Sequence, residues 1–141
     1  MKKRVKLIYL HLFVLGILIA SGSFSGAKAQ DNDDRWKLVL SNSTEEYYYD
    51  SVTVSTEGDT TIVWIKTVYK EKLKDGDGKL MKSAVNSLYL FCGKNRYTLK
   101  DVEVTYVDGK KKAVDYEEKN KPIKPDSPIE KVYNIFCKAE E

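Results

Sequence analysis

The stretch Thr60-Thr-Ile-Val-Trp-Ile-Lys-Thr-Val-Tyr-Lys-Glu-Lys72 has the clearest strand pattern of the chain and follows the turn signal Gly58-Asp59. Apolar side chains occur on both of its faces: Ile62, Trp64 and Val68 on one, and Val63, Ile65 and Tyr69 on the other. This arrangement predicts a central strand that is covered on each side. The far end is polar, so we expect it to run out into solvent.

Shorter strand patterns, separated by turn signals, surround this stretch. We expect strands over Arg35–Leu40, Tyr47–Tyr49, Ala84–Cys92, Arg96–Val107 and Lys110–Tyr116. The last three are joined by a tight turn at Gly93-Lys94-Asn95 and a hairpin signal at Asp108-Gly109. The charged, proline-bearing segment 117–125 predicts a connector.

A helix is predicted to close the chain. Ser127 is a suitable N-cap, Pro128 suits the first helical position, and Glu130 follows three residues after the cap. Apolar residues then recur at helical spacing, forming one stripe that faces a core: Ile129, Val132, Tyr133 and Phe136. The sequence therefore predicts a small α+β domain.

The first 29 residues have the three parts of a secretory signal peptide. A basic start precedes the uncharged run Leu7–Ala20, and small residues then lead to Ala27-Lys28-Ala29. An uncleaved membrane anchor is the alternative, but the run is shorter than the about 20 apolar residues that span a bilayer. We therefore expect cleavage before Gln30, leaving one exported domain over residues 30–141 without a membrane anchor.

Cys92 and Cys137 are the only two cysteines of the chain. An even pair in a small exported domain usually forms a disulfide, and two buried free thiols are the alternative. Cys137 lies beside the apolar stripe of the predicted helix. A disulfide to Cys92 would therefore pin that helix to the sheet.

Removal of the signal segment changes the charge and the available chemistry. Five of the 24 Lys and Arg residues lie within residues 1–29, so 19 basic residues face 21 acidic ones in the remainder. Overall charge therefore gives no support for nucleic-acid binding. The one histidine, His11, lies in the signal segment, so the exported part lacks His-based catalysis and most kinds of zinc site.

The segment Asp75-Gly76-Asp77-Gly78-Lys79 has the spaced aspartates of an EF-hand calcium loop. The fifth, sixth and twelfth positions of such a loop need an oxygen ligand, a glycine and a glutamate. Here they hold Lys79, Leu80 and Asn86, so the match fails and a surface turn is predicted. We predict no metal, no cofactor and no enzymatic activity, and expect the carboxylates to be solvated.

One basic cluster occurs in the exported part: Lys110, Lys111 and Lys112, followed by Lys119, Lys121 and Lys124. Acidic residues interrupt it, which favours a solvated hairpin edge where lysines block unwanted strand pairing. A contact patch for an anionic partner is the second interpretation. Lys110, Lys111 and Lys112 are thus the candidate partner contact.

The ordered set of short motifs along the chain resembles the surface-adhesin protein E-like family of bacterial exported proteins. The motifs are Trp36 with Val39, Tyr48-Tyr49-Asp50-Ser51 with Val54, Val63-Trp64-Ile65 with Tyr69, Leu88–Cys92, Val104-Thr105-Tyr106, Ile123–Ser127 and the closing helix to Cys137. The resemblance implies an antiparallel sheet that carries a C-terminal helix tied to it by a disulfide.

The resemblance also implies a binding role toward host extracellular components and a capacity to form a homodimer. The adhesin that names the family is lipid-anchored, whereas this chain has no cysteine at its cleavage site. Periplasmic, cell-surface and released locations therefore remain open. A periplasmic structural or accessory protein with an envelope partner is the alternative function.

Overall fold

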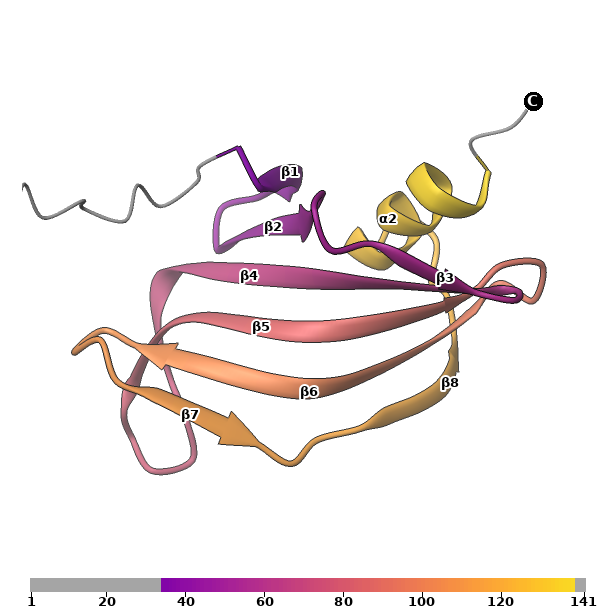
Figure 1. The fold of residues 1–141 in the computed structure, drawn as a ribbon. Coiled ribbons are helices and arrows are strands. Elements are labelled where there is room, and N and C mark those ends of the chain that lie inside the picture. Colours follow the sequence, from indigo (N-terminus) through magenta and orange to yellow (C-terminus); the bar gives the residue numbers. More distant parts are fainter. Residues whose placement is uncertain (1–33, 139–141) are drawn as a thin grey trace, which may run out of the picture. The chain divides into compact units, whose positions relative to one another are not determined.

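The structure, a computed structural model, describes residues 34–138. The predicted signal peptide, residues 1–29, lies outside the described residues. Within the described part, eight strands form one antiparallel sheet and one helix follows them (Figure 1). This confirms the predicted α+β class, with an antiparallel sheet and a C-terminal helix.

The sheet has the strand order β1-β2-β4-β5-β6-β7, with β3 paired to β4 and β8 paired to β6. The elements are β1 (Trp36–Ser41), β2 (Glu45–Asp50), β3 (Ser55–Glu57), β4 (Thr60–Lys74), β5 (Leu80–Phe91), β6 (Arg96–Tyr106), β7 (Lys111–Val114), β8 (Glu118–Pro122) and α2 (Pro128–Cys137). The stretch that predicted a central strand is β4, which pairs with β2 and β3 along one edge and β5 along the other. Its last five residues are exposed, as the polar pattern indicated.

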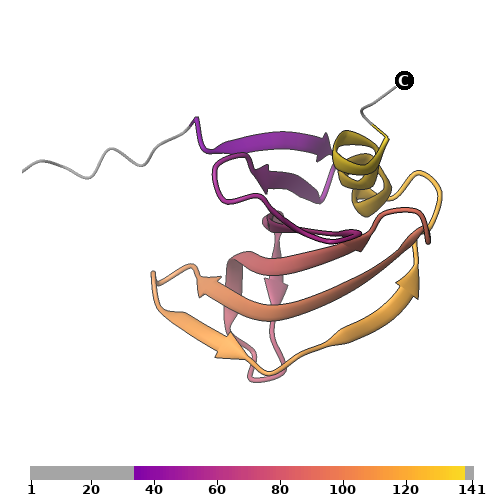
Figure 2. The same ribbon diagram turned by 45° about the vertical axis from the view of Figure 1, so that its right-hand side comes forward.

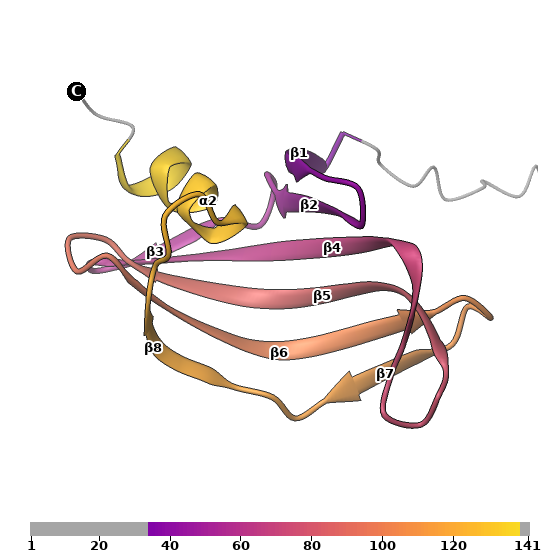
Figure 3. The same ribbon diagram turned by 180° about the vertical axis from the view of Figure 1, so that it is seen from behind.

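The prediction of a connector over residues 117–125 is wrong, because part of this segment forms β8. Arg96 and Tyr97 of β6 pair with Pro122 and Lys121 of β8. Figure 3 shows β7 and β8 following one another along the same side of β6. An edge strand with polar residues on both faces lacks the alternation that marks a strand in sequence, and proline is tolerated at an edge.

Two apolar clusters lie on one face of the sheet. Side chains two residues apart along a strand share a face, and the β4–β5 register runs without interruption from Thr60 to Val68. Val63 and Leu88 belong to the first cluster, which α2 covers with Val132 and Tyr133. Ala84 belongs to the second cluster, farther along the same face. The helix therefore covers one end of this face and leaves the other end to the second cluster.

A β-bulge in β6 keeps both clusters on that face. Val85 pairs with Glu103 while Ser87 pairs with Lys100, so β6 has one extra residue between these pairs. Asp101 sits in the bulge with a positive φ of 57°. The buried Ser87 hydroxyl donates to the Asp101 carboxylate and lies 3.1 Å from the Lys100 carbonyl oxygen. The bulge bends the sheet, and Figure 2 shows the pronounced curvature of its strands.

The closing helix is fixed at both ends. At its start, Ser127 caps it by accepting a hydrogen bond from the Glu130 backbone N–H, with Pro128 at the first position, as predicted. At its end, Cys137 forms a disulfide with Cys92, which confirms the predicted link between helix and sheet. Between them, the Gly93 backbone N–H donates to the Tyr133 hydroxyl at 3.2 Å.

A buried carboxylate holds the start of the described chain. Asp50 has no exposed surface and accepts hydrogen bonds from the Arg35 guanidinium and from the Val52 and Thr53 backbone N–H groups. Burial opposes ionisation of Asp50, but the hydrogen bonds from Arg35, Thr53 and Val52 together outweigh it and hold the Asp50 pKa far below its usual range. Asp50 therefore clamps the chain before β1 to the bend after β2.

Candidate functional site

The uncovered end of the sheet face forms a groove of about 480 Å³, which we call the sheet groove. Its lining comes from β4 to β7 and two adjoining segments: Tyr69, Asp75, Gly76, Asp77, Met81, Ala84, Asn86, Val102, Val104, Tyr106, Lys112, Val114 and Tyr116. The buried residues Ala84 and Val104, with the partly buried Met81 and Val102, belong to the second apolar cluster. The groove therefore has an apolar floor and polar side chains around it.

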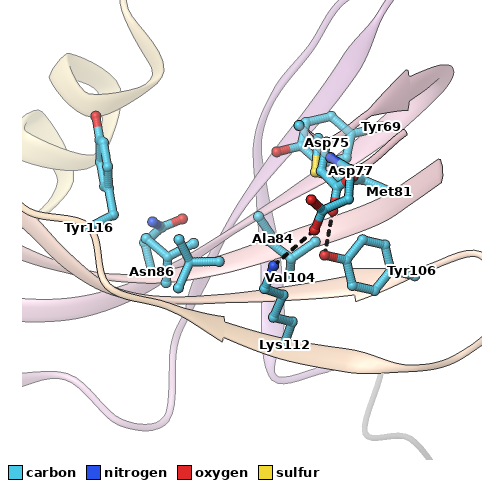
Figure 4. A pocket seen from close by; sticks show the side chains of 13 residues that line it. Tyr69, Asp75, Asp77, Met81, Ala84, Asn86, Val104, Tyr106, Lys112 and Tyr116 are labelled. Atoms are coloured by element: carbon cyan, nitrogen blue, oxygen red, sulfur yellow. Dashed lines mark hydrogen bonds and ion pairs between the residues drawn. The ribbon is translucent and has the colours of Figure 1, made fainter. Parts of the chain in front are cut away.

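Carboxylates and tyrosines gather at one end of the sheet groove (Figure 4). The Tyr106 hydroxyl donates to Asp75 at 2.7 Å, and the same carboxylate accepts from the Asp77 and Lys79 backbone N–H groups. The hydrogen bond from Tyr106 is the main reason that the Asp75 pKa lies below its usual value. The same bond, aided by burial, raises the pKa of Tyr106 to about 12. Asp75 is thus committed to holding the 75–79 turn against β6.

The rest of the charge at this end is paired. The Lys112 ammonium lies 3.4 Å from the Asp77 carboxylate, which joins β7 to the turn between β4 and β5. Lys79 lies over the Tyr106 ring, 5.7 Å from its centroid. The segment predicted as a surface turn therefore closes one end of the groove. Within residues 34–138, no group of three or more His, Cys, Asp or Glu side chains is placed to hold a metal ion.

Three polar side chains of the sheet groove have no hydrogen-bond partner among the residues that the structure describes. They are the hydroxyls of Tyr69 and Tyr116 and the side-chain amide of Asn86. Tyr69 and Asn86 are partly buried, whereas Tyr116 is 49% exposed. Burial, followed by the charge of Glu45, raises the pKa of Tyr69, so its hydroxyl stays protonated at neutral pH. These groups remain available to a bound molecule.

Sequence reasoning did not identify Asn86 as a site residue, although a signal was present. Asn86 lies on the same face of β5 as Leu88 and Ala84, both of which are buried. A polar residue at a core-facing position of a strand is unusual unless a partner satisfies it or the face is open there. Tyr69 and Tyr116 gave no such signal, because tyrosine is common in strands.

The candidate contact residues Lys110, Lys111 and Lys112 do not share one face. Successive residues of β7 point to opposite sides of the sheet, so Lys112 lines the sheet groove while Lys111 does not. Each of the three has a carboxylate within 4.0 Å: Asp108 beside Lys110, Glu103 beside Lys111 and Asp77 beside Lys112. All three remain more than half exposed, at 81%, 63% and 52%.

Comparison with known proteins gives one match. The profile of the family described as Surface-adhesin protein E matches residues 36–138, which is most of the chain. No curated protein and no solved structure matches it. In the part of the chain that the structure describes, no helix has the length and apolar character needed to cross a membrane.

Proposed function

The chain belongs to the surface-adhesin protein E family, and from this premise we propose that it is an exported, non-catalytic binding protein whose partner is a host extracellular component. The family match carries the proposal. It assigns the chain to a class of surface-adhesin-like binding proteins. The proposal takes residues 30–141 as the exported domain, released when residues 1–29 are removed.

Export is tested by the N-terminus of the native protein. Mass spectrometry of protein purified from its own cells should find Gln30, free or cyclised, as the first residue. Fractionation of the same cells should place the protein at the surface or in the medium. Intact chain beginning at Met1 in the membrane fraction contradicts export, and a strictly periplasmic location favours the accessory role with an envelope partner.

Partner binding is tested with immobilised extracellular-matrix proteins at low and at physiological salt. Lys110, Lys111 and Lys112 are three consecutive, exposed cationic side chains at the start of β7. Changing all three to Gln should weaken binding to the matrix proteins, most strongly at low salt. Such contacts mainly change the association rate, since they are exposed and screened.

A matched control removes the same charge elsewhere. Lys37, Lys94 and Lys131 are exposed and lie on β1, the turn after β5 and α2, so their change to Gln should leave binding unaltered. Equal loss in both triple variants assigns the effect to net charge. Equal binding by wild type and the β7 variant returns the three lysines to a solvated strand edge. Failure of the wild-type protein to bind any matrix protein contradicts the host-binding function itself.

A further inference from the structure

The sheet groove combines features that suit a small, uncharged ligand with its own hydrogen-bonding groups. Its volume of about 480 Å³ falls within the about 300–1,000 Å³ typical of ligand pockets. Asn86 presents an unpaired amide beside an apolar floor, where a polar group gains most from a bound partner. A purely apolar ligand would cover this amide without offering it a hydrogen-bond partner.

The charges of the groove do not select an ion. Lys112 and Asp77 already neutralise one another, and both oxygens of Asp75 accept hydrogen bonds from within the protein. An anionic or cationic ligand would have to displace these contacts. The free groups are instead uncharged: one amide, which both donates and accepts, and the two tyrosine hydroxyls of Tyr69 and Tyr116.

These groups lie along the groove with its apolar floor between them. Figure 4 shows Tyr116 and Asn86 toward one end, Ala84 and Val104 in the middle, and Tyr69 at the far end. The C–H face of a pyranose ring packs well against a tyrosine ring, and its hydroxyls exchange hydrogen bonds with hydroxyl groups. An acetamido substituent would add an amide able to pair with the Asn86 amide and a methyl group able to pack on the apolar floor at Ala84.

We propose that the sheet groove binds an N-acetylated, uncharged sugar unit, with Asn86 recognising the acetamido group and Tyr116 packing against the sugar ring. This rests on the proposed function, because it makes the glycan of a host extracellular component the molecule that the domain recognises. The lysine contacts then adjust the association rate while the groove supplies the specificity.

The test is a titration of the ¹⁵N-labelled domain, residues 30–141 with its disulfide intact, with chitotriose as the probe. The side-chain NH₂ resonances of Asn86 should shift in a saturable manner. Cellotriose has the same backbone without acetamido groups and should bind at least tenfold more weakly. Equal binding of the two sugars, or no shift with either, overturns the proposal.

Variants separate recognition from folding. Asn86→Ala should weaken chitotriose binding about tenfold and abolish the preference over cellotriose. Tyr116→Ala, at an exposed position where folding is not at risk, should weaken binding of both sugars. Lys111→Gln, on the neighbouring strand but outside the groove, should change neither affinity. Unchanged affinity in both groove variants, with unaltered thermal unfolding, overturns the assignment.

The source of the sugar is tested by competition between chitotriose and other glycans. Matrix-protein binding, measured separately, tests the proposed function. Displacement of chitotriose by an N-acetyllactosamine chain supports a host glycan. Displacement by peptidoglycan fragments alone supports the sugar site but contradicts the host partner. Matrix-protein binding that persists in Asn86→Ala and Tyr116→Ala, together with no sugar binding, overturns the sugar site and leaves the proposed function standing. Shifts of Asn86 caused only by matrix-derived peptides identify a peptide groove and overturn the sugar.

Discussion

Removal of the disulfide by changing Cys92 and Cys137 to Ser should lower the free energy of unfolding by about 4 kcal/mol. The bond closes a loop of 45 positions, and the entropy that such a link removes from the unfolded chain corresponds to about 4 kcal/mol at 25 °C. Domains of this size have total stabilities of about 5–15 kcal/mol, so the loss is a large part of the whole. At about 4–8 °C per kcal/mol, the unfolding temperature should fall by about 15–30 °C.

The structure indicates where the loss will appear first. Helix α2 has ten residues, which is too short to persist in water without its packing against the sheet. Its residues Val132 and Tyr133 are buried against the sheet, and Phe136 meets the Tyr49 ring edge-on with the ring centroids 5.3 Å apart. These contacts should keep the helix docked at low temperature, so the double variant should be folded but should lose helix early on heating.

The assay is urea unfolding followed by far-ultraviolet circular dichroism, with and without dithiothreitol. Reductant should lower the stability of the wild-type protein to that of the double variant and leave the variant unchanged. Amide exchange should increase first in residues 128–137. A loss below about 1 kcal/mol, or an equal effect of reductant on both proteins, would refute the reasoning, because it means that the link does not constrain the unfolded chain.

Two further changes test the clamp and the bulge. Asp50→Asn should lower the free energy of unfolding at pH 7 by about 2 kcal/mol, since the buried hydrogen bonds from Arg35, Val52 and Thr53 lose their charged acceptor. The Asp50 pKa is lower in the folded state than in the unfolded state, where it is about 3.9, so ionised Asp50 adds stability at pH values above about 4. This added stability is lost as the pH falls below that value toward the folded-state pKa. Urea midpoints from pH 7 to pH 2 should therefore fall more steeply in wild type than in Asp50→Asn, and parallel curves contradict this. Ser87→Ala should cost about 1–2 kcal/mol in urea unfolding, because it removes the hydroxyl that holds the bulge. A change below about 0.5 kcal/mol would mean that the bulge needs no such support.

Much of the fold was predictable because strong local signals agree with the tertiary structure. β4 is paired along both edges, as expected of a central strand, with Val63 in the core and Ile62 and Trp64 of the opposite face only partly buried. The cap at Ser127 and the apolar stripe of α2 serve the same helix, so each signal reinforces the other. The disulfide followed from the number of cysteines and the expected compartment.

The elements that sequence reasoning missed are short edge strands without an apolar face of their own. Strands β3 and β8 lie outside the main path of the sheet, and all residues of β3 and all but the first of β8 are exposed. An exposed edge strand has no apolar face, so its sequence does not differ from that of a loop. Its position depends on the free edges of β4 and β6, which no local pattern reports.

The sheet groove depends on a change of phase in β6 that the sequence does contain. Tyr97 and Leu99, at odd positions, face the first apolar cluster, whereas Val104 and Tyr106, at even positions, face the second. A regular strand cannot place both sets on one face, because side chains alternate with a period of two. One inserted residue is therefore required between them, and the bulge at Asp101 supplies it. The same insertion keeps the far end of β6 apolar on the face that α2 covers only in part, so the groove follows from joining long strands to a ten-residue closing helix.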